Sequence, residues 1–314
     1  MSNSSNGSRP AVASTVRNGD VQLAVFEQGN PDGPTLVLVH GWPDTHRLWE
    51  HVVPLLADRF RVVSYDSRGA GQSTVPTAVA DYRLELLASD LFAVIDAVSP
   101  DAPVHVLAHD WGSLESWEAV CAPGADRRIA SLTSVSGWCF DHLGHWMRRN
   151  LTSPTPAGVG KVLAQFAASF YALLFHIPVL PALVTGRLLA PRWPRFLALF
   201  DGMDPALARP AATIGRDAAN GVKRYRANTR DRLLRPRERR TEIPVQLIVN
   251  TRDKAVLPFG FEETQRWVAD LRRAEIPAGH WAPLSHSADL ARIAAGFVDS
   301  IENAAATDGS TVTA

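Results

Sequence analysis

The chain has 314 residues, of which 46% are hydrophobic and 20% are charged. This length accommodates one large core, or a core with a modest insertion. The 32 basic and 32 acidic residues cancel, which excludes a global positive field that would attract nucleic acid. Cys121 and Cys139 lie in apolar surroundings, and we expect buried free thiols in a reducing, cytoplasmic compartment.

Both ends of the chain are expected to be flexible tails, over residues 1–19 and 304–314. The first ten residues are rich in Ser, Asn and Gly and lack the apolar segment of a signal peptide. Between the tails, apolar runs alternate with segments of helical periodicity. Strands are predicted at 21–26, 35–39, 61–65, 104–108, 129–135, 245–249 and 271–276. Helices are predicted at 47–57, with a break at Pro54, and at 81–98, 114–121, 261–268 and 288–301. Such repeated β–α units predict an α/β fold with a mostly parallel central sheet flanked by helices.

Two loops follow the early strands. The segment HGWP, residues 40–43, comes directly after the strand predicted at 35–39. A tight turn there serves either to end the strand or to aim the backbone N–H of Trp42 at a negatively charged oxygen. The segment DSRGAGQS, residues 66–73, has the look of a phosphate-binding loop, but Thr74 occupies the third glycine position of the dinucleotide fingerprint. We therefore interpret 66–73 as a tight connection between a strand and a helix.

The strand predicted at 104–108 leads to Asp110, which lies between the small residues Ala108 and Gly112. This pattern is typical of a nucleophile elbow, a strained strand-to-helix turn that lifts one side chain above the sheet edge. Serine is the usual residue there, whereas an aspartate attacks a saturated carbon and forms an ester. Asp110 is therefore predicted to be a carboxylate nucleophile, and the backbone N–H groups of Trp42 and Trp111 are predicted to form its oxyanion hole.

An ester on Asp110 must be hydrolysed, so a water-activating histidine with an orienting carboxylate is expected. His280 lies in a glycine-led loop after the strand predicted at 271–276, and Asp253 follows the strand predicted at 245–249. Each residue alone is equally typical of a loop cap or a turn. Together with Asp110 they lie at one edge of the sheet in the order nucleophile, acid, histidine. This order predicts that His280 is the general base and that Asp253 orients it.

Residues 137–242 interrupt the alternation and divide the core into 20–136 and 243–303. Their Trp, Phe and Leu clusters predict a helical cap insertion over the edge of the sheet where ligands bind. The apolar stretch 162–184 includes polar residues and two prolines, so we expect no transmembrane span. A weak peripheral membrane contact, helped by the basic stretch 216–240, is an alternative to a solvated helix surface.

The motifs at 40–43, 66–73 and 109–112 resemble those of the α/β-hydrolase superfamily, specifically its aspartate-nucleophile epoxide hydrolases. The resemblance covers about residues 20–303 and includes the hydrolase half of bacterial fusions with a short-chain dehydrogenase. Ala108 stands where glycine is commoner and Trp42 where phenylalanine is frequent, and neither departure changes the chemistry. The resemblance implies an α/β-hydrolase fold, covalent catalysis by a catalytic triad, and no cofactor. The sequence has no Cys/His spacing typical of a metal site either.

Two cap tyrosines are similar to the pair with which epoxide hydrolases hydrogen-bond the epoxide oxygen. Tyr171 stands seven residues before Pro178, and Tyr225 begins a Tyr-Arg-x-Asn segment. Either tyrosine alone is equally typical of cap packing. The two contexts together favour an epoxide hydrolase that opens an apolar epoxide to a vicinal diol.

Two other functions stay open. A haloalkane dehalogenase uses the same nucleophile and holds the halide with indole N–H groups, and the chain has nine tryptophans. A non-catalytic, ligand-binding relative is a remote alternative. We expect a monomer or homodimer that binds an apolar small-molecule epoxide and no nucleic acid. Side chains expected to bind the substrate are Trp42, Pro43, Trp111, Phe175 and Trp281.

Overall fold

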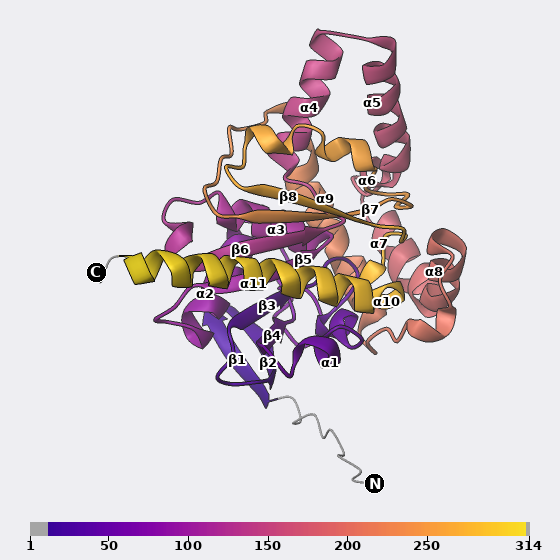
Figure 1. Ribbon diagram of the computed structural model, residues 1–314. Coiled ribbons are helices and arrows are strands. Elements are labelled where there is room, and N and C mark those ends of the chain that lie inside the picture. Colours follow the sequence, from indigo (N-terminus) through magenta and orange to yellow (C-terminus); the bar gives the residue numbers. More distant parts are fainter. Residues whose placement is uncertain (1–11, 312–314) are drawn as a thin grey trace.

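The computed structural model describes residues 12–311, which are built around an eight-stranded sheet (Figure 1). The spatial order of the strands is β1-β2-β4-β3-β5-β6-β7-β8. β1 pairs antiparallel with β2, and β2 with β4, whereas all later neighbours are parallel. The bounds are β1 (Val12–Asn18), β2 (Val21–Gly29), β3 (Thr35–Val39), β4 (Arg61–Tyr65), β5 (Val104–His109), β6 (Ile129–Val135), β7 (Val245–Asn250) and β8 (Leu271–Ile276). The predicted α/β fold is confirmed.

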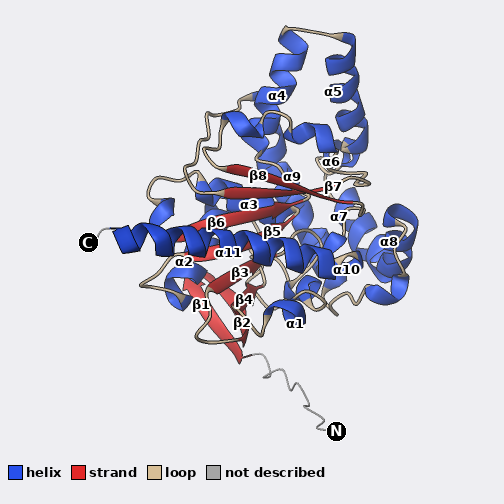
Figure 2. Cartoon of the chain, in the orientation of Figure 1, coloured by secondary structure: helices blue, strands red, loops and turns tan. Residues whose placement is uncertain are grey.

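Helices cover both faces of the sheet (Figure 2). Side chains alternate across a strand, so Val37 and Val39 of β3 pack with one set of helices and Leu36 and Leu38 with the other. The first set is α2 (Leu84–Val98) and α3 (Trp111–Val120), and the second is α1 (Val53–Leu56), α10 (Ala282–Ser285) and α11 (Ser287–Thr311). Both faces of β3 are therefore buried, which explains why its sequence is a continuous apolar run.

A group of helices between β6 and β7 forms the cap. Its longer members are α4 (Phe140–Thr152), α5 (Pro156–Ala168), α8 (Trp193–Asp201) and α9 (Ile214–Leu234); its shorter ones are α6 (Phe170–Leu174), α7 (Leu180–Leu183), η4 (Val184–Leu189), η5 (Ala190–Arg192) and η6 (Pro205–Leu207). Asn228 of α9 fastens the cap to the core. Its Oδ1 accepts the N–H of Leu84 at 2.9 Å, and its Nδ2 donates to the carbonyl of Tyr82 at 2.8 Å. The cap thereby supplies the missing N-terminal capping group of α2.

Several predicted boundaries need correction. The N-terminal tail is shorter than 1–19, because β1 pairs with β2 through a turn in which Gly19 has φ +59°; residues 1–11 lie outside the described residues. β1 is an edge strand with mostly exposed side chains, so its polar sequence carried no burial signal. The C-terminal tail, expected from 304, is helical to Thr311, and 312–314 lie outside the described residues.

Two predicted helices in the core also differ in form. The helix expected at 261–268 is replaced by two single 3₁₀ turns, η7 (Pro258–Phe261) and η8 (Thr264–Arg266). Gly260 packs closely on the indole of Trp138, where a Cβ would lie 2.5 Å from Nε1. The helix expected at 47–57 is interrupted, as predicted, and forms η1 (His46–Trp49) and α1, but the interruption lies at 50–52 and Pro54 lies in the first turn of α1. Tertiary packing thus overrides a local helical pattern.

The structure bears on two further expectations, which concern the cysteines and a transmembrane span. Both cysteines are free thiols, with Cys139 buried and Cys121 half-buried, and burial raises the pKa of Cys121 to about 12. Among the helices of residues 12–311, none combines the length and the apolar character needed to cross a bilayer.

Candidate active site

Asp110 occupies the turn between β5 and α3 with φ +52° and ψ −123°. Non-glycine residues rarely adopt such a backbone conformation, and it is characteristic of functional sites. The turn also brings α3 very close to β3, since a Cβ on Gly112 would lie 2.3 Å from the carbonyl oxygen of Val39. These contacts explain the need for a small residue after Asp110, as predicted for a nucleophile elbow.

His280 and Asp253 lie beside Asp110, at the ends of β8 and β7. His280 Nδ1 is 2.8 Å from Asp253 Oδ2, and His280 Nε2 is 3.5 Å from Asp110 Oδ2. The other oxygen of Asp253 accepts the backbone N–H groups of Ala255 and Val256 at 2.8 and 2.9 Å. Asp253 is therefore fixed on one side by backbone donors and orients the histidine with the other. The structure brings together all three residues of the predicted triad.

Both predicted oxyanion donors contact the Asp110 carboxylate. The backbone N–H of Trp42 donates to Asp110 Oδ1 at 2.7 Å, and the backbone N–H of Trp111 also hydrogen-bonds to the carboxylate. Gly41 is required by this approach, because a Cβ there would lie 2.3 Å from Asp110 Oδ1. Asp110 Oδ2 remains on the side of His280.

His40, which carried no predicted role, braces the Trp42 loop. Its Nε2 accepts the N–H of Ser67 at 3.0 Å, so its Nδ1 carries the proton and donates to the carbonyl of Gly41 at 2.8 Å. Burial lowers the pKa of His40 to about 4, which keeps the ring neutral at physiological pH. The DSRGAGQS segment, which includes Ser67, therefore serves as a support for the oxyanion loop.

Tyr171 and Tyr225 face the same cavity as Asp110. Their ring centroids are 5.8 Å apart, and the Tyr225 ring lies 4.8 Å from the indole of Trp111. The two hydroxyls hydrogen-bond to each other, and the Tyr225 hydroxyl also hydrogen-bonds to the Trp111 side chain. Burial raises the pKa of both tyrosines. Both hydroxyls are therefore protonated at neutral pH and available as donors.

The cavity above Asp110 has a volume of about 420 Å³ and is mostly apolar. Trp111 is the one residue of the predicted substrate-binding set that lines it. Several lining residues were not predicted, because they share no motif; they include Leu114, Trp138, Phe140, Leu143, Met147, Phe166, Leu173 and Leu233. They come from different helices, so only the tertiary fold gathers them.

The other residues of the predicted substrate-binding set lie behind the cavity wall. The indole of Trp42 donates to the carbonyl of Ala218 at 3.0 Å and packs against α9 at Gly221. Phe175 stacks edge-on against Trp42 and Tyr225, with centroid distances of 5.4 and 4.9 Å. Pro43 borders a separate crevice, and Trp281 packs on His280 at 4.7 Å. None of these four side chains lines the cavity, and their contact with substrate stays a prediction.

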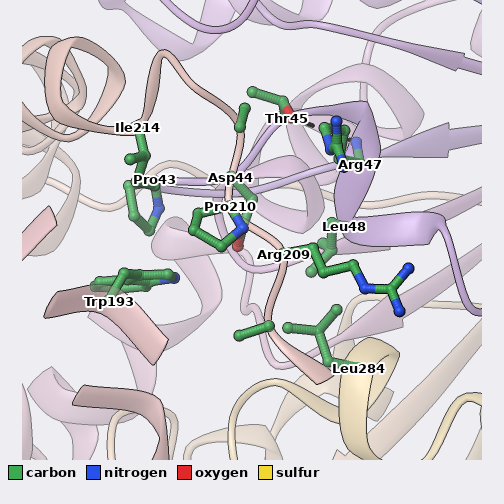
Figure 3. A pocket seen from close by; sticks show the side chains of 12 residues that line it. Pro43, Asp44, Thr45, Arg47, Leu48, Trp193, Arg209, Pro210, Ile214 and Leu284 are labelled. Atoms are coloured by element: carbon green, nitrogen blue, oxygen red, sulfur yellow. Dashed lines mark hydrogen bonds between the residues drawn. The ribbon is translucent and has the colours of Figure 1, made fainter. Parts of the chain in front are cut away.

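Two further carboxylates were missed by sequence reasoning. Asp44 accepts the indole N–H of Trp281 at 2.9 Å, and burial, with the nearby Asp110 charge, raises its pKa to about 7. Figure 3 shows Asp44 at a crevice between core and cap, which holds about 20 Å³, room for roughly one water molecule. Asp201, at the end of α8, accepts the backbone N–H groups of His280 and Trp281 at 2.8 and 2.6 Å. No sequence motif marks either residue.

The charges of the site favour an ionised Asp110 beside a protonated His280. Burial would raise the pKa of Asp110, but the hydrogen bond and charge of His280 lower it below its ordinary value. Burial would likewise lower the pKa of His280, but the carboxylates of Asp253 and Asp110 raise it well above its ordinary value. Loss of the Asp110 charge must therefore lower the pKa of His280, so that more of the ring is neutral and able to accept a proton.

This coupling predicts a measurable pKa change. Replacement of Asp110 by asparagine, which is neutral like an ester, should lower the pKa of His280 by about 1 unit or more, as expected for removal of one nearby opposite charge. NMR titration of the His280 ring in both proteins measures the shift. An equal or higher pKa in the Asp110→Asn protein would contradict the charge coupling.

The fold and the site define a hydrolase of one large family. The sequence profile of the alpha/beta hydrolase fold matches residues 34–287, and the chain belongs to this family. It is 44% identical over 284 residues to the "Probable oxidoreductase EphD" of Mycobacterium tuberculosis, covering 89% of this chain and 48% of that protein. The chain thus spans about half the length of this relative.

Relatives named as epoxide hydrolases are more distant. "Epoxide hydrolase A" of Mycobacterium tuberculosis is 38% identical over 122 residues, which are 38% of this chain and 37% of that protein. The crystal structure of Bacillus megaterium epoxide hydrolase with an inhibitor has a TM-score of 0.69 at 19% identity, and the match covers 91% of this chain and 100% of that one. The likeness to that structure concerns the fold. The chain is an epoxide hydrolase-like α/β hydrolase.

Proposed function

We propose that this protein hydrolyses an apolar epoxide to a vicinal diol. One observation carries the proposal: the Asp110 carboxylate and the hydroxyls of Tyr171 and Tyr225 face the same apolar cavity. A nucleophile on one side of a bound epoxide and two proton donors on the other are what ring opening requires. The names of several relatives support the same reaction.

In the first step, the tyrosine hydroxyls hold the epoxide oxygen and Asp110 Oδ2 attacks a ring carbon. A carbon–oxygen bond to Asp110 forms as the ring carbon–oxygen bond breaks, and a tyrosine proton passes to the leaving oxygen. The product is a hydroxyalkyl ester of Asp110 with a transient tyrosinate. The apolar cavity excludes water during this step, which strengthens the hydrogen bonds to the oxygen.

In the second step, His280 first gives up its resting proton, which restores the tyrosinate to tyrosine. The neutral histidine then takes a proton from water, and the resulting hydroxide attacks the ester carbonyl. The backbone N–H of Trp42 already holds Asp110 Oδ1, and the backbone N–H of Trp111 hydrogen-bonds to the same carboxylate, so both are in place for the negative charge that develops there. Collapse of this intermediate releases the diol and restores the Asp110 carboxylate. His280 keeps the proton taken from water and is protonated as at the start, and the net reaction adds one water to one epoxide. Among the described residues, no cluster suited to a metal ion occurs.

The test compares two electrophiles on one protein. We expect turnover of a chromogenic styrene oxide derivative, followed by diol formation, and no halide release from a bromoalkane of similar size. An Asp110→Ala protein is the control for background hydrolysis. Halide release with no diol would instead assign the site to a haloalkane dehalogenase, and binding of both compounds without turnover would favour the non-catalytic relative.

A further inference from the structure

The cap carries a strong local charge imbalance in a chain that is neutral as a whole. Residues 142–200 include six basic residues and no Asp or Glu; the six are Arg148, Arg149, Lys161, Arg187, Arg192 and Arg195. Arg149 and Lys161 form ion pairs with Glu263 and Glu262 of the core. Arg187, Arg192 and Arg195 are exposed, and none has a carboxylate partner among residues 12–311. This part of the cap therefore presents uncompensated positive charge.

The same part of the cap exposes an unusual amount of apolar surface. Within residues 163–188, eleven large hydrophobic side chains are exposed, and we call these exposed Leu, Ile, Val and Phe residues the cap apolar face. The most exposed are Val179 at 66%, Leu163 at 61% and Leu188 at 59%. Isolated exposed hydrophobics are ordinary, but a concentration of this kind marks an interaction surface. The helices α5, α6 and α7 carry most of this face, and in Figure 1 they lie on the right-hand side of the cap, across from α4.

The active-site cavity reaches the surface within this face. Phe166 and Leu173 line the cavity with Asp110, yet their side chains are 50% and 55% exposed. Arg230 of α9 also lines the cavity and is exposed. The cavity mouth is thus bordered by apolar side chains of the cap apolar face and by an arginine.

We propose that the cap apolar face docks on the surface of an anionic lipid membrane. Apolar side chains flanked by arginines are the pattern of a surface that enters the boundary between lipid headgroups and acyl chains, with the guanidinium groups on the phosphates. A second copy of the chain is a poorer occupant, because a symmetric contact would bring two acid-free, positively charged segments together. If the proposed function holds, an apolar epoxide then passes from the bilayer into the cavity mouth.

The docking is tested by flotation of the full chain with lipid vesicles, without any assay of activity. The protein should float with phosphatidylcholine vesicles that contain phosphatidylglycerol, and much less with phosphatidylcholine alone. Salt at about 1 M, where the Debye length is roughly 3 Å, should release most of it. Failure to float with the anionic vesicles at low salt would overturn the proposal.

Matched variants locate the contact. Replacing Arg187, Arg192 and Arg195 together with glutamine should weaken partitioning about 100-fold, from the usual contribution of each basic residue near an anionic surface. The double variant Val179→Ser with Leu180→Ser should also lose flotation. None of these five residues lines the cavity, so epoxide turnover in solution should stay unchanged in both variants.

Two control variants and two further measurements complete the test. Leu55 of α1 is 52% exposed and Arg17 of β1 is exposed, and both lie outside the cap. The Leu55→Ser and Arg17→Gln variants should float like the unchanged protein. Thermal unfolding verifies that each variant folds. If the cap variants float as well as the controls, the face is not the lipid contact. If light scattering instead shows a dimer that the Val179→Ser, Leu180→Ser protein cannot form, the occupant is a second copy.

Discussion

Replacing His280 with glutamine should leave an ester on Asp110 that accumulates during incubation with an epoxide. The Asp110 carboxylate and its oxyanion donors are unchanged by this substitution, so attack on the ring proceeds. Glutamine has no basic nitrogen to take a proton from water, so hydrolysis of the ester stops. Turnover should fall by roughly 10⁴-fold or more, as it does when one member of a catalytic triad is removed. Mass spectrometry of the intact protein should show an increase equal to the mass of the epoxide, and peptide mapping should place it on Asp110.

The matched controls separate this effect from general damage. His286→Gln changes a half-buried histidine six residues further along, which contacts Ser285 rather than the site, and it should turn over normally without an adduct. Asp110→Ala should give neither turnover nor adduct. Normal turnover by the His280→Gln protein, or an adduct on another residue, would refute the assigned roles.

The second large effect concerns the two cap tyrosines. Replacing both Tyr171 and Tyr225 with phenylalanine keeps the rings that pack against Trp111 and Phe175 but removes the two hydroxyls. Without a proton donor, the epoxide oxygen would leave as an alkoxide inside an apolar cavity. Ring opening should therefore slow by about 10²–10⁴-fold, the usual contribution of general acid catalysis. The rate of adduct formation in the His280→Gln background isolates this step from ester hydrolysis.

Tyr82→Phe is the matched control for that pair. The Tyr82 hydroxyl donates to the carbonyl of Pro76 at 3.0 Å, away from the cavity, so its loss should leave the rate of adduct formation unaltered. Unchanged ring opening in the Tyr171→Phe, Tyr225→Phe protein would mean that the epoxide oxygen is protonated elsewhere.

The triad was predictable because each member follows an apolar strand, and parallel strands end at one edge of the sheet. Asp110, Asp253 and His280 needed only this geometry and a recognisable turn. The cavity wall was not predictable, since helices α4, α5, α6 and α9 each contribute a few apolar residues whose helical spacing is the same whether they face the core or a ligand. Nearness in sequence to the motif residues likewise does not show which side chains line the cavity: Pro43 and Trp281 adjoin motif residues and do not line it. Asp201 lies 79 positions before His280, and only the fold joins them.

Asp201 also restricts how this enzyme fold opens. A cap that swung away as one rigid lid would draw α8 from the His280 loop and strip two backbone N–H groups of their acceptor. Each unpaired group costs about 1–3 kcal/mol where it stays buried, and the histidine would lose its orientation whenever the lid was raised. Exchange of substrate and product without this penalty requires α8 to stay seated while α5 and α6 move. Local movement of α5 and α6, with α8 fixed, would keep His280 oriented throughout the catalytic cycle.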